Sequence, residues 1–165
     1  MAEPEYTKVV MVTGEGEVSY VETPWVVPVS DGHFRLENIP FYAYGISLGD
    51  ILEATPADDD PRPLVRRVVT KSGNRTLRVL ADEGAPSVPQ SLLDKIESVG
   101  CSYTGATPRY ICINIPPIVP LDTVVAVLVK SHLRWEHADP TYDQLHPDEP
   151  QLPAPKPSKP WWRFW

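Results

Sequence analysis

Short apolar runs alternate with turn residues through the first 74 positions of the chain, and this pattern predicts β-strands. Asp31-Gly32 separates two of the runs and favours the tight turn of a β-hairpin, because glycine readily adopts a positive φ. Five short strands with tight turns predict a small, SH3-like partial β-barrel over residues 1–74. The predicted strands cover residues 8–13, 23–29, 33–36, 51–54 and 64–70.

Helical spacing begins after residue 75. One apolar face runs from Val88 to Val99 and a second from Leu121 to Val129, each with a proline near its start. With the strand-like runs around them, the helices complete the order β-α-β-β-α-β, which is typical of a ferredoxin-like α+β sandwich over residues 75–138. The strand-like runs cover residues 76–81, 101–104, 109–115 and 132–136.

The sheet of this sandwich has two faces, and the helices cover one. We expect the N-terminal barrel to cover the other, because Leu77, Val79, Ile111 and Ile113 leave both faces partly apolar.

Residues 139–165 form a Pro-rich tail that ends in aromatic side chains. Exposed aromatic clusters are costly in water. The tail therefore either docks on its own domain or anchors the chain to a partner or a membrane surface. The anchor residues are Trp161, Trp162, Phe164 and Trp165.

The chain is acidic, with a formal net charge of −7 over 165 residues. This charge disfavours nucleic-acid binding and suits a basic protein partner, although it also suits solubility alone. No run approaches the roughly 20 apolar residues of a membrane helix, and the N-terminus lacks the apolar core of a signal peptide. We therefore expect a cytoplasmic protein with no transmembrane segment.

Two cysteines, Cys101 and Cys112, are too few for a disulfide scaffold. If the hairpin closes between Thr104 and Arg109, its register pairs Cys101 with Cys112. We expect two buried thiols, and a redox switch or a metal pair remains the alternative. The four histidines show no metal-ligand spacing, so no metal or cofactor is expected.

An aromatic loop and an acidic loop are the candidate contact surface for a protein partner. Tyr42 and Tyr44 lie between Pro40 and Gly45, and an acidic run follows at residues 58–60. Aromatic anchors with acidic steering charges suit recognition of a basic partner. The predicted partner-binding residues are Tyr42, Tyr44, Asp58, Asp59 and Asp60.

A pocket between the two parts is the second hypothesis, lined by Asn38, Asp50 and Arg78, and it would belong to a small enzyme or a ligand-binding domain. Asp50 and Glu53 form no catalytic carboxylate pair, because residues three apart in a strand face opposite sides. Arg78 is expected to be a surface charge or to pair with Asp50 or Glu53, with anion binding as the alternative. No catalytic residue is assigned.

Three blocks of the sequence resemble an uncharacterised bacterial family catalogued as domain of unknown function 4265. The first block runs from Leu36 through Asp50 to Glu53, the second from Ser72 to Val79, and the third comprises Gly100-Cys101 and Ile115-Pro116-Pro117. The resemblance covers about residues 7–137 and implies no catalytic residues. By association with small bacterial proteins of this sort, we expect a non-enzymatic immunity protein that occludes a toxin. An adaptor that acts through its tryptophan tail is the weaker alternative.

Overall fold

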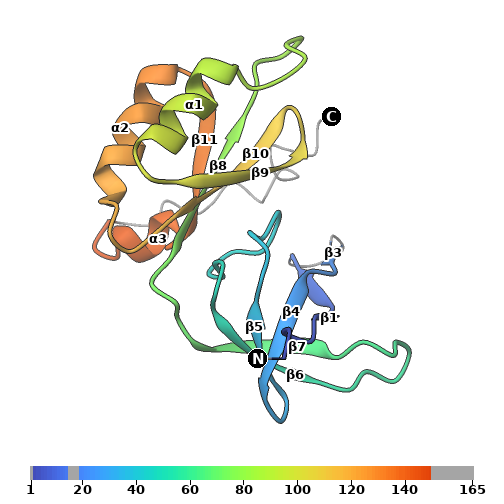
Figure 1. The fold of residues 1–165 in the computed structure, drawn as a ribbon. Helices are drawn as coiled ribbons and strands as arrows, with labels where there is room; N and C mark the ends of the chain where they lie inside the picture. Colours follow the sequence, from blue (N-terminus) through green and yellow to red (C-terminus); the bar gives the residue numbers. More distant parts are fainter. Residues whose placement is uncertain (1, 15–18, 150–165) are drawn as a thin grey trace.

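The computed structural model describes residues 2–14 and 19–149, and these form an N-terminal and a C-terminal part. The segment 71–74 joins the two parts and lies between the last strand of the first and the first strand of the second (Figure 1). The fold is α+β, with mostly antiparallel sheets and three short helices among the described residues.

The N-terminal part contains a five-stranded antiparallel sheet in the order β1-β4-β5-β6-β7 and a separate two-stranded sheet, β2-β3. Beyond β1, Val10 forms an isolated parallel bridge with Leu64, so the sheet curls until its ends meet without closing into a barrel. The strands are β1 (Thr7–Lys8), β2 (Met11–Thr13), β3 (Tyr20–Glu22), β4 (Trp25–Ser30), β5 (His33–Leu36), β6 (Ile51–Thr55) and β7 (Leu64–Thr70).

The predicted hairpin at Asp31-Gly32 is confirmed between β4 and β5, and Gly32 has a φ of 70°. In β5, Phe34 and Leu36 pack into the core while Arg35 points outward, as the alternation predicts. The single strand predicted over residues 8–13 was wrong. It divides at Val10, because this residue pairs with the start of β7 while Met11–Thr13 turns to pair with β3.

The C-terminal part has the predicted order β-α-β-β-α-β, and its sheet has the antiparallel order β11-β8-β10-β9. A short helix that was not predicted follows β11, and it begins with a capping box between Thr141 and Gln144. The elements are β8 (Arg75–Leu80), α1 (Gln90–Ser98), β9 (Ser102–Thr107), β10 (Tyr110–Ile115), α2 (Leu121–Ser131), β11 (Arg134–Asp139) and α3 (Tyr142–Leu145).

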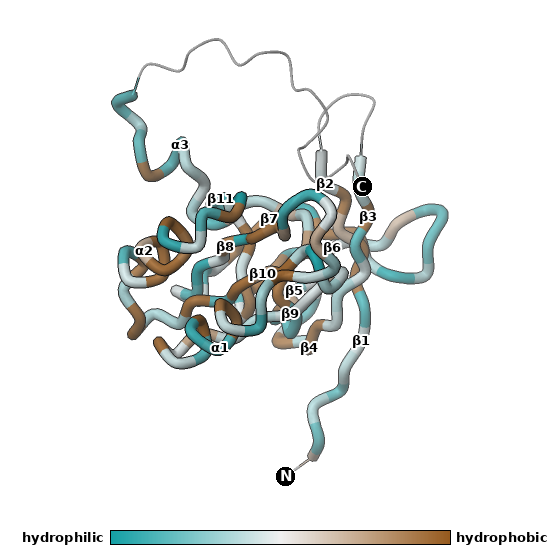
Figure 2. The backbone as a smooth tube through the Cα atoms, turned by 90° about the horizontal axis from the view of Figure 1, so that it is seen from above, coloured by the Kyte–Doolittle hydropathy of each residue, from teal (hydrophilic) through white to brown (hydrophobic). Residues whose placement is uncertain are grey.

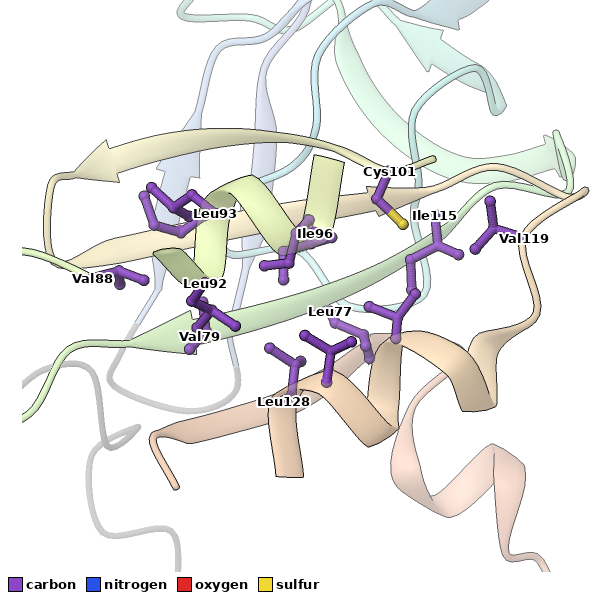
Figure 3. Packing of buried hydrophobic residues seen from close by; sticks show 14 of the residues in the cluster. Leu77, Val79, Val88, Leu92, Leu93, Ile96, Cys101, Ile115, Val119 and Leu128 are labelled. Carbon is purple, nitrogen blue, oxygen red and sulfur yellow. The ribbon is translucent and has the colours of Figure 1, made fainter. Parts of the chain in front are cut away.

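Two helices, α1 and α2, cover one face of this sheet and enclose the larger apolar core (Figure 3). Leu93 and Ile96 of α1, Leu128 of α2 and Leu77 of β8 are all buried there. The hydropathy colouring shows the same apolar concentration along α2 and β10 (Figure 2). No described helix is long and apolar enough to cross a membrane.

The opposite face of the sheet is covered, as expected, but the reason given for that expectation was wrong. Leu77, Val79, Ile111 and Ile113 all belong to the helix-side core, because alternate residues of a strand share one face. The loop between β5 and β6 covers this face, and its residue Ile39 packs against the sheet. The sheet residues in that cluster are Leu80, Tyr110 and Cys112.

The cysteines do not pair across the hairpin, which corrects the predicted register. Cys112 lies opposite Thr104, because β9 continues to Thr107 and the turn that follows is tighter than predicted. Cys101 packs in the helix-side core and Cys112 on the opposite face, so the two are separate, buried, free thiols.

Candidate functional site

The loop between β5 and β6, residues 37–50, crosses the junction between the two parts and is the structural centre of the candidate site. We call residues 41–44 of this loop the aromatic loop. Three of its backbone N–H groups share one carboxylate: Glu22 of β3 accepts hydrogen bonds from Phe41, Tyr42 and Ala43 at 2.7, 2.9 and 2.9 Å. Charge-assisted bonds of this kind are about twice as strong as neutral ones. Glu22 is only 8% exposed, so its charge holds the loop instead of facing solvent.

Arg78 of β8 holds the same loop through its carbonyl groups. Its guanidinium donates to the carbonyl oxygens of Tyr42 and Ala43, and it lies 3.5 Å from a carboxylate oxygen of Glu136. The Tyr44 ring lies over the guanidinium, with 5.0 Å between the guanidinium carbon and the ring centroid. Arg78 is fully buried, so the expected surface charge and the pairing with Asp50 or Glu53 were both wrong.

A second polar cluster lies where the loop returns to β6. Lys71 Nζ is 2.5 Å from Oδ2 of Asp50 and 2.5 Å from Oδ2 of Asp139, and it also donates to the Gly45 carbonyl. The Ser47 hydroxyl donates to Asp139 at 2.6 Å and lies 2.7 Å from the Thr76 hydroxyl. Ser47, Thr76 and Asp50 are fully buried, so a substrate cannot reach them in this conformation. Their arrangement holds the loop in place.

Burial further suppresses the ionisation of two groups on this face, Cys112 and Tyr110. Burial raises the pKa of the Cys112 thiol to about 12, so the reactive thiolate is scarce at neutral pH. Burial also raises the pKa of Tyr110, whose hydroxyl donates to the Phe41 carbonyl at 2.8 Å. Tyr42 stacks on Tyr110 with 6.1 Å between ring centroids. The described residues contain no cluster of three or more histidine, cysteine or carboxylate side chains fit for a metal.

A groove of about 590 Å³, which we call the junction groove, opens beside the aromatic loop. It has aromatic and apolar sides from β3 and β4, and Thr104 of β9 contributes from the C-terminal part. Asn38 holds one end in place, since its side-chain oxygen accepts the Trp25 N–H at 2.6 Å. Lys8 Nζ lies 4.6 Å from the centroid of the Trp25 ring. The lining also includes Val21, Glu22, Glu37, Ile39, Phe41, Tyr42 and Leu48.

The predicted site residues do not lie together in one place. Asn38 and Tyr42 line the junction groove, whereas Asp50 and Arg78 are buried beneath the loop. Tyr44 is 46% exposed, and its hydroxyl donates to Glu136 at 2.9 Å on the β11 side. The predicted tail anchors, Trp161, Trp162, Phe164 and Trp165, lie outside the described residues.

The acidic loop, residues 58–60, lies elsewhere. It belongs to the β6–β7 connection, which projects away from the C-terminal part (Figure 1). Asp58 and Asp59 are exposed, whereas Asp60 forms a two-bond pair with Arg62 at 2.8 and 2.6 Å. The Arg62 hydrogen bonds lower the pKa of Asp60 to about 2. The aromatic and acidic loops therefore do not form one continuous surface.

Sequence reasoning did not identify Glu22, Ser47, Lys71 or Asp139. Their partners are distant in the chain: Glu22 meets residues 19 to 21 positions later, and Lys71 meets Asp139 68 positions later. No local pattern indicates such pairs. Arg78 had a usable signal, because Leu77 and Val79 beside it define one face and place Arg78 on the other.

Comparisons with known proteins add a family and a fold. A family model described as "Domain of unknown function (DUF4265)" matches residues 22–137. A hypothetical protein from Neisseria gonorrhoeae, whose crystal structure is described as novel, is similar with a TM-score of 0.70 and 21% identity. That similarity covers 84% of this chain and 97% of the other, and at this identity it shows the fold alone. The comparison with curated proteins finds no match.

Proposed function

We propose that the chain, which belongs to the DUF4265 family, is a protein-binding module whose contact surface is the junction groove. The observation that carries this proposal is the exposure of large apolar side chains around the groove. Trp25 is 46% exposed and Val21 is 60% exposed, and Tyr6 close to Trp25 is 54% exposed. Exposed apolar patches commonly mark interaction sites, and tryptophan and tyrosine are enriched among the residues that dominate binding energy.

The aromatic loop, which lines the groove, favours binding because hydrogen bonds already hold it in one conformation. Glu22 and Arg78 fix the aromatic loop from its N–H and C=O sides, so Phe41 and Tyr42 are held before a partner arrives. A surface that is ordered in advance loses less conformational entropy on binding.

The edge of the C-terminal sheet suggests how a partner segment lies in the groove. Among the described residues, β9 pairs with β10 alone, and Thr104 of β9 lines the groove. An extended partner segment can add to such an edge through main-chain hydrogen bonds while alternate side chains enter the groove. Pairing with β9 would direct those side chains toward Phe41 and Tyr42.

The most concrete form of this function is a cytoplasmic immunity protein that occludes a toxin. The net charge of −7 and the exposed Asp58 and Asp59 support a basic partner, because acidic charges raise the rate of encounter with one. In this proposal the junction groove anchors the toxin, and the acidic loop steers it without direct contact.

A site-specific crosslinking experiment tests the groove. Val21 and Val129 are exposed valines, 60% and 55% accessible, and only Val21 lines the groove. A photo-reactive phenylalanine analogue at position 21 should capture a protein in the native host, and the same residue at position 129 of α2 should not. The captured protein, once purified, should bind the Trp25→Ala variant about tenfold or more weakly. Equal capture at both positions, or unchanged affinity of Trp25→Ala, would contradict the groove.

A charge-reversal experiment tests the steering role once that partner is purified. Asp58→Lys with Asp59→Lys should lower the association rate and its salt dependence. Asp82→Lys with Glu83→Lys makes the same charge change at exposed positions of the β8–α1 connection and serves as the control. Equal effects of both variants would leave net charge, and not the acidic loop, as the cause. A partner that is harmless when expressed alone would contradict the immunity role.

A small ligand in the junction groove is the second candidate, and the volume of about 590 Å³ favours it. Of the three residues predicted for such a pocket, Asn38 would contact the ligand, whereas Asp50 and Arg78 would support the loop beneath it. A third candidate, an adaptor that acts through the tail, predicts that deletion of residues 153–165 changes localisation while the free energy of unfolding stays the same.

We infer that the curled N-terminal sheet is an SH3-like partial barrel, on the support of its five short strands and the Val10–Leu64 bridge. We infer a ferredoxin-like sandwich for the C-terminal part from its element order and its sheet order.

A further inference from the structure

A second hollow, of about 600 Å³, lies beside β11 and is separate from the junction groove. β11 and β9 are opposite edges of the C-terminal sheet, so the two hollows lie on different sides of this part. Three segments build the second one: the aromatic loop, β11 and α3. We call it the β11 pocket, and its lining consists of Tyr44, Trp135, Glu136, His137, Thr141 and Tyr142, with Asp143 beside them.

The walls of the β11 pocket are mainly aromatic. The His137 ring lies 5.2 Å from Trp135, edge to face, and 6.4 Å from Tyr142, measured between ring centroids. Tyr142 in turn lies 4.2 Å from the His146 ring. Tyr44 and Tyr142 are 46% and 51% exposed, so their side chains remain accessible to a ligand.

Charges around the pocket favour a cation. Two acidic residues, Glu136 and Asp143, line the pocket, and the carboxylate of Glu136 lies 3.5 Å from the Arg78 guanidinium. Burial together with His146 lowers the pKa of His137. The lowered pKa favours the uncharged form of the His137 ring. Tyr44 already receives one cation on its ring, the Arg78 guanidinium, at 5.0 Å.

We propose that the β11 pocket binds a small organic cation with a quaternary ammonium group. Aromatic faces attract cations, and cages of aromatic side chains are suited to methylated ammonium groups. A quaternary ammonium group carries no N–H donor, so it needs no acceptor inside the pocket. A primary ammonium or a guanidinium would need several such acceptors. Of the two acidic residues in the lining, Glu136 already accepts from the Tyr44 hydroxyl and lies beside Arg78, which leaves Asp143 alone for this role.

The binding experiment uses choline and tetramethylammonium as probes, followed by backbone NMR shifts of the full chain at constant ionic strength. Both should shift signals of Trp135, His137 and Tyr142 in a saturable way. The uncharged analogue of choline, 3,3-dimethylbutan-1-ol, has the same shape and should bind about tenfold more weakly. Equal binding of choline and the alcohol would overturn the proposal, and so would the absence of any saturable shift.

Variants of Tyr142 separate the pocket from the rest of the surface. Tyr142→Leu should weaken choline binding by about tenfold, and Tyr142→Phe, which keeps the aromatic face, should restore it. Tyr6→Leu is the control, because Tyr6 is equally exposed and lies outside the pocket. Unchanged binding in Tyr142→Leu would overturn the assignment.

A trimethyllysine peptide distinguishes the two sources of such a group. Tighter binding of the peptide than of choline supports a methylated protein as the ligand, and tighter binding of choline supports a small molecule. If the unmethylated peptide binds as well as the methylated one, the preference for a quaternary ammonium is wrong.

Discussion

The two faces of the β11-β8-β10-β9 sheet are covered in opposite ways. On the helix side, α1 and α2 cover the sheet with aliphatic side chains such as Leu93, Ile96 and Leu128. On the junction side, the aromatic loop is fixed by buried charges, with Arg78 below it and Glu22 beside it. Buried apolar area and side-chain shape stabilise the helix side, whereas individual hydrogen bonds of buried charges stabilise the junction side.

The two faces therefore differ in how well they tolerate substitutions. Aliphatic cores accept many substitutions of similar volume, because burial has no direction. Buried charges act through fixed geometry, and removing one partner leaves the other uncompensated. We therefore expect the helix side to tolerate substitutions of similar volume, and the junction side to lose stability when a single charged partner is removed.

Removing the charge of Arg78 should have the largest effect. Arg78→Met is expected to lower the free energy of unfolding by about 3–5 kcal/mol, because Glu136 and two loop carbonyls lose their buried partner. Urea unfolding measures the loss. The double variant Arg78→Met with Glu136→Leu should recover part of it, since no unpaired charge then remains. A loss below about 1 kcal/mol for Arg78→Met would contradict the claim that buried charges stabilise the junction side.

Opening a cavity on the helix side should cost slightly less and leave the loop in place. Leu128→Ala is expected to lower the free energy of unfolding by about 3 kcal/mol, through lost burial and a residual cavity. The backbone NMR shifts of residues 41–44 should stay near their original values. Large shifts there would show that the two faces are coupled.

The carboxylate of Glu22 should contribute less than the guanidinium. Glu22→Gln keeps the shape of the side chain but replaces a charged acceptor of three N–H groups, and we expect a loss of about 2 kcal/mol. Glu37→Gln is the matched control, because its pair with Arg35 is partly exposed and should contribute about 1 kcal/mol or less. Equal losses in the two variants would contradict the special role of Glu22.

The solvent-accessible pair of Asp60 and Arg62 provides the small-effect reference. The pKa of Asp60 in the folded chain is about 2, below the value of about 4 for an unfolded aspartate. Its contribution to stability is therefore complete above about pH 4 and is lost as the pH falls toward 2. NMR titration of the side-chain carboxyl should give a midpoint near 2. In Arg62→Gln the midpoint should rise toward 4, and an unchanged midpoint would exclude Arg62 as the cause.

Local patterns made part of the fold predictable. Both long helices begin after a proline, and the buried residues of α1 follow the predicted apolar spacing. In α2 the prediction holds for Val124 and Leu128 but was wrong for Val129, which is 55% exposed, while Val127 is buried. The Asp31-Gly32 hairpin needs only a positive φ at glycine. Each of these signals lies within a few residues of the element that it specifies, which is why the sequence contains it in readable form.

The candidate site was predictable only in outline. The sequence indicated an aromatic loop at a junction, but it did not indicate that Glu22 would hold its N–H groups, because a glutamate in a strand is usually solvated. The register of Cys112 was missed because it depends on one bulge between Tyr110 and Ile111 and on the length of β9. Such features follow from the tertiary structure and leave no periodic signal.

The hydrogen bonds that hold the aromatic loop also connect the two parts of the chain. Residues 71–74 mark a boundary in the sequence, yet charged partners cross it: Lys71 bonds Asp139, and Arg78 bonds the carbonyls of residues 42 and 43. A fragment that starts at residue 75 would keep Arg78 and lose every loop carbonyl that it contacts. We therefore expect the two parts to fold as one unit, so that neither truncated expression nor recombination at this boundary yields a stable half.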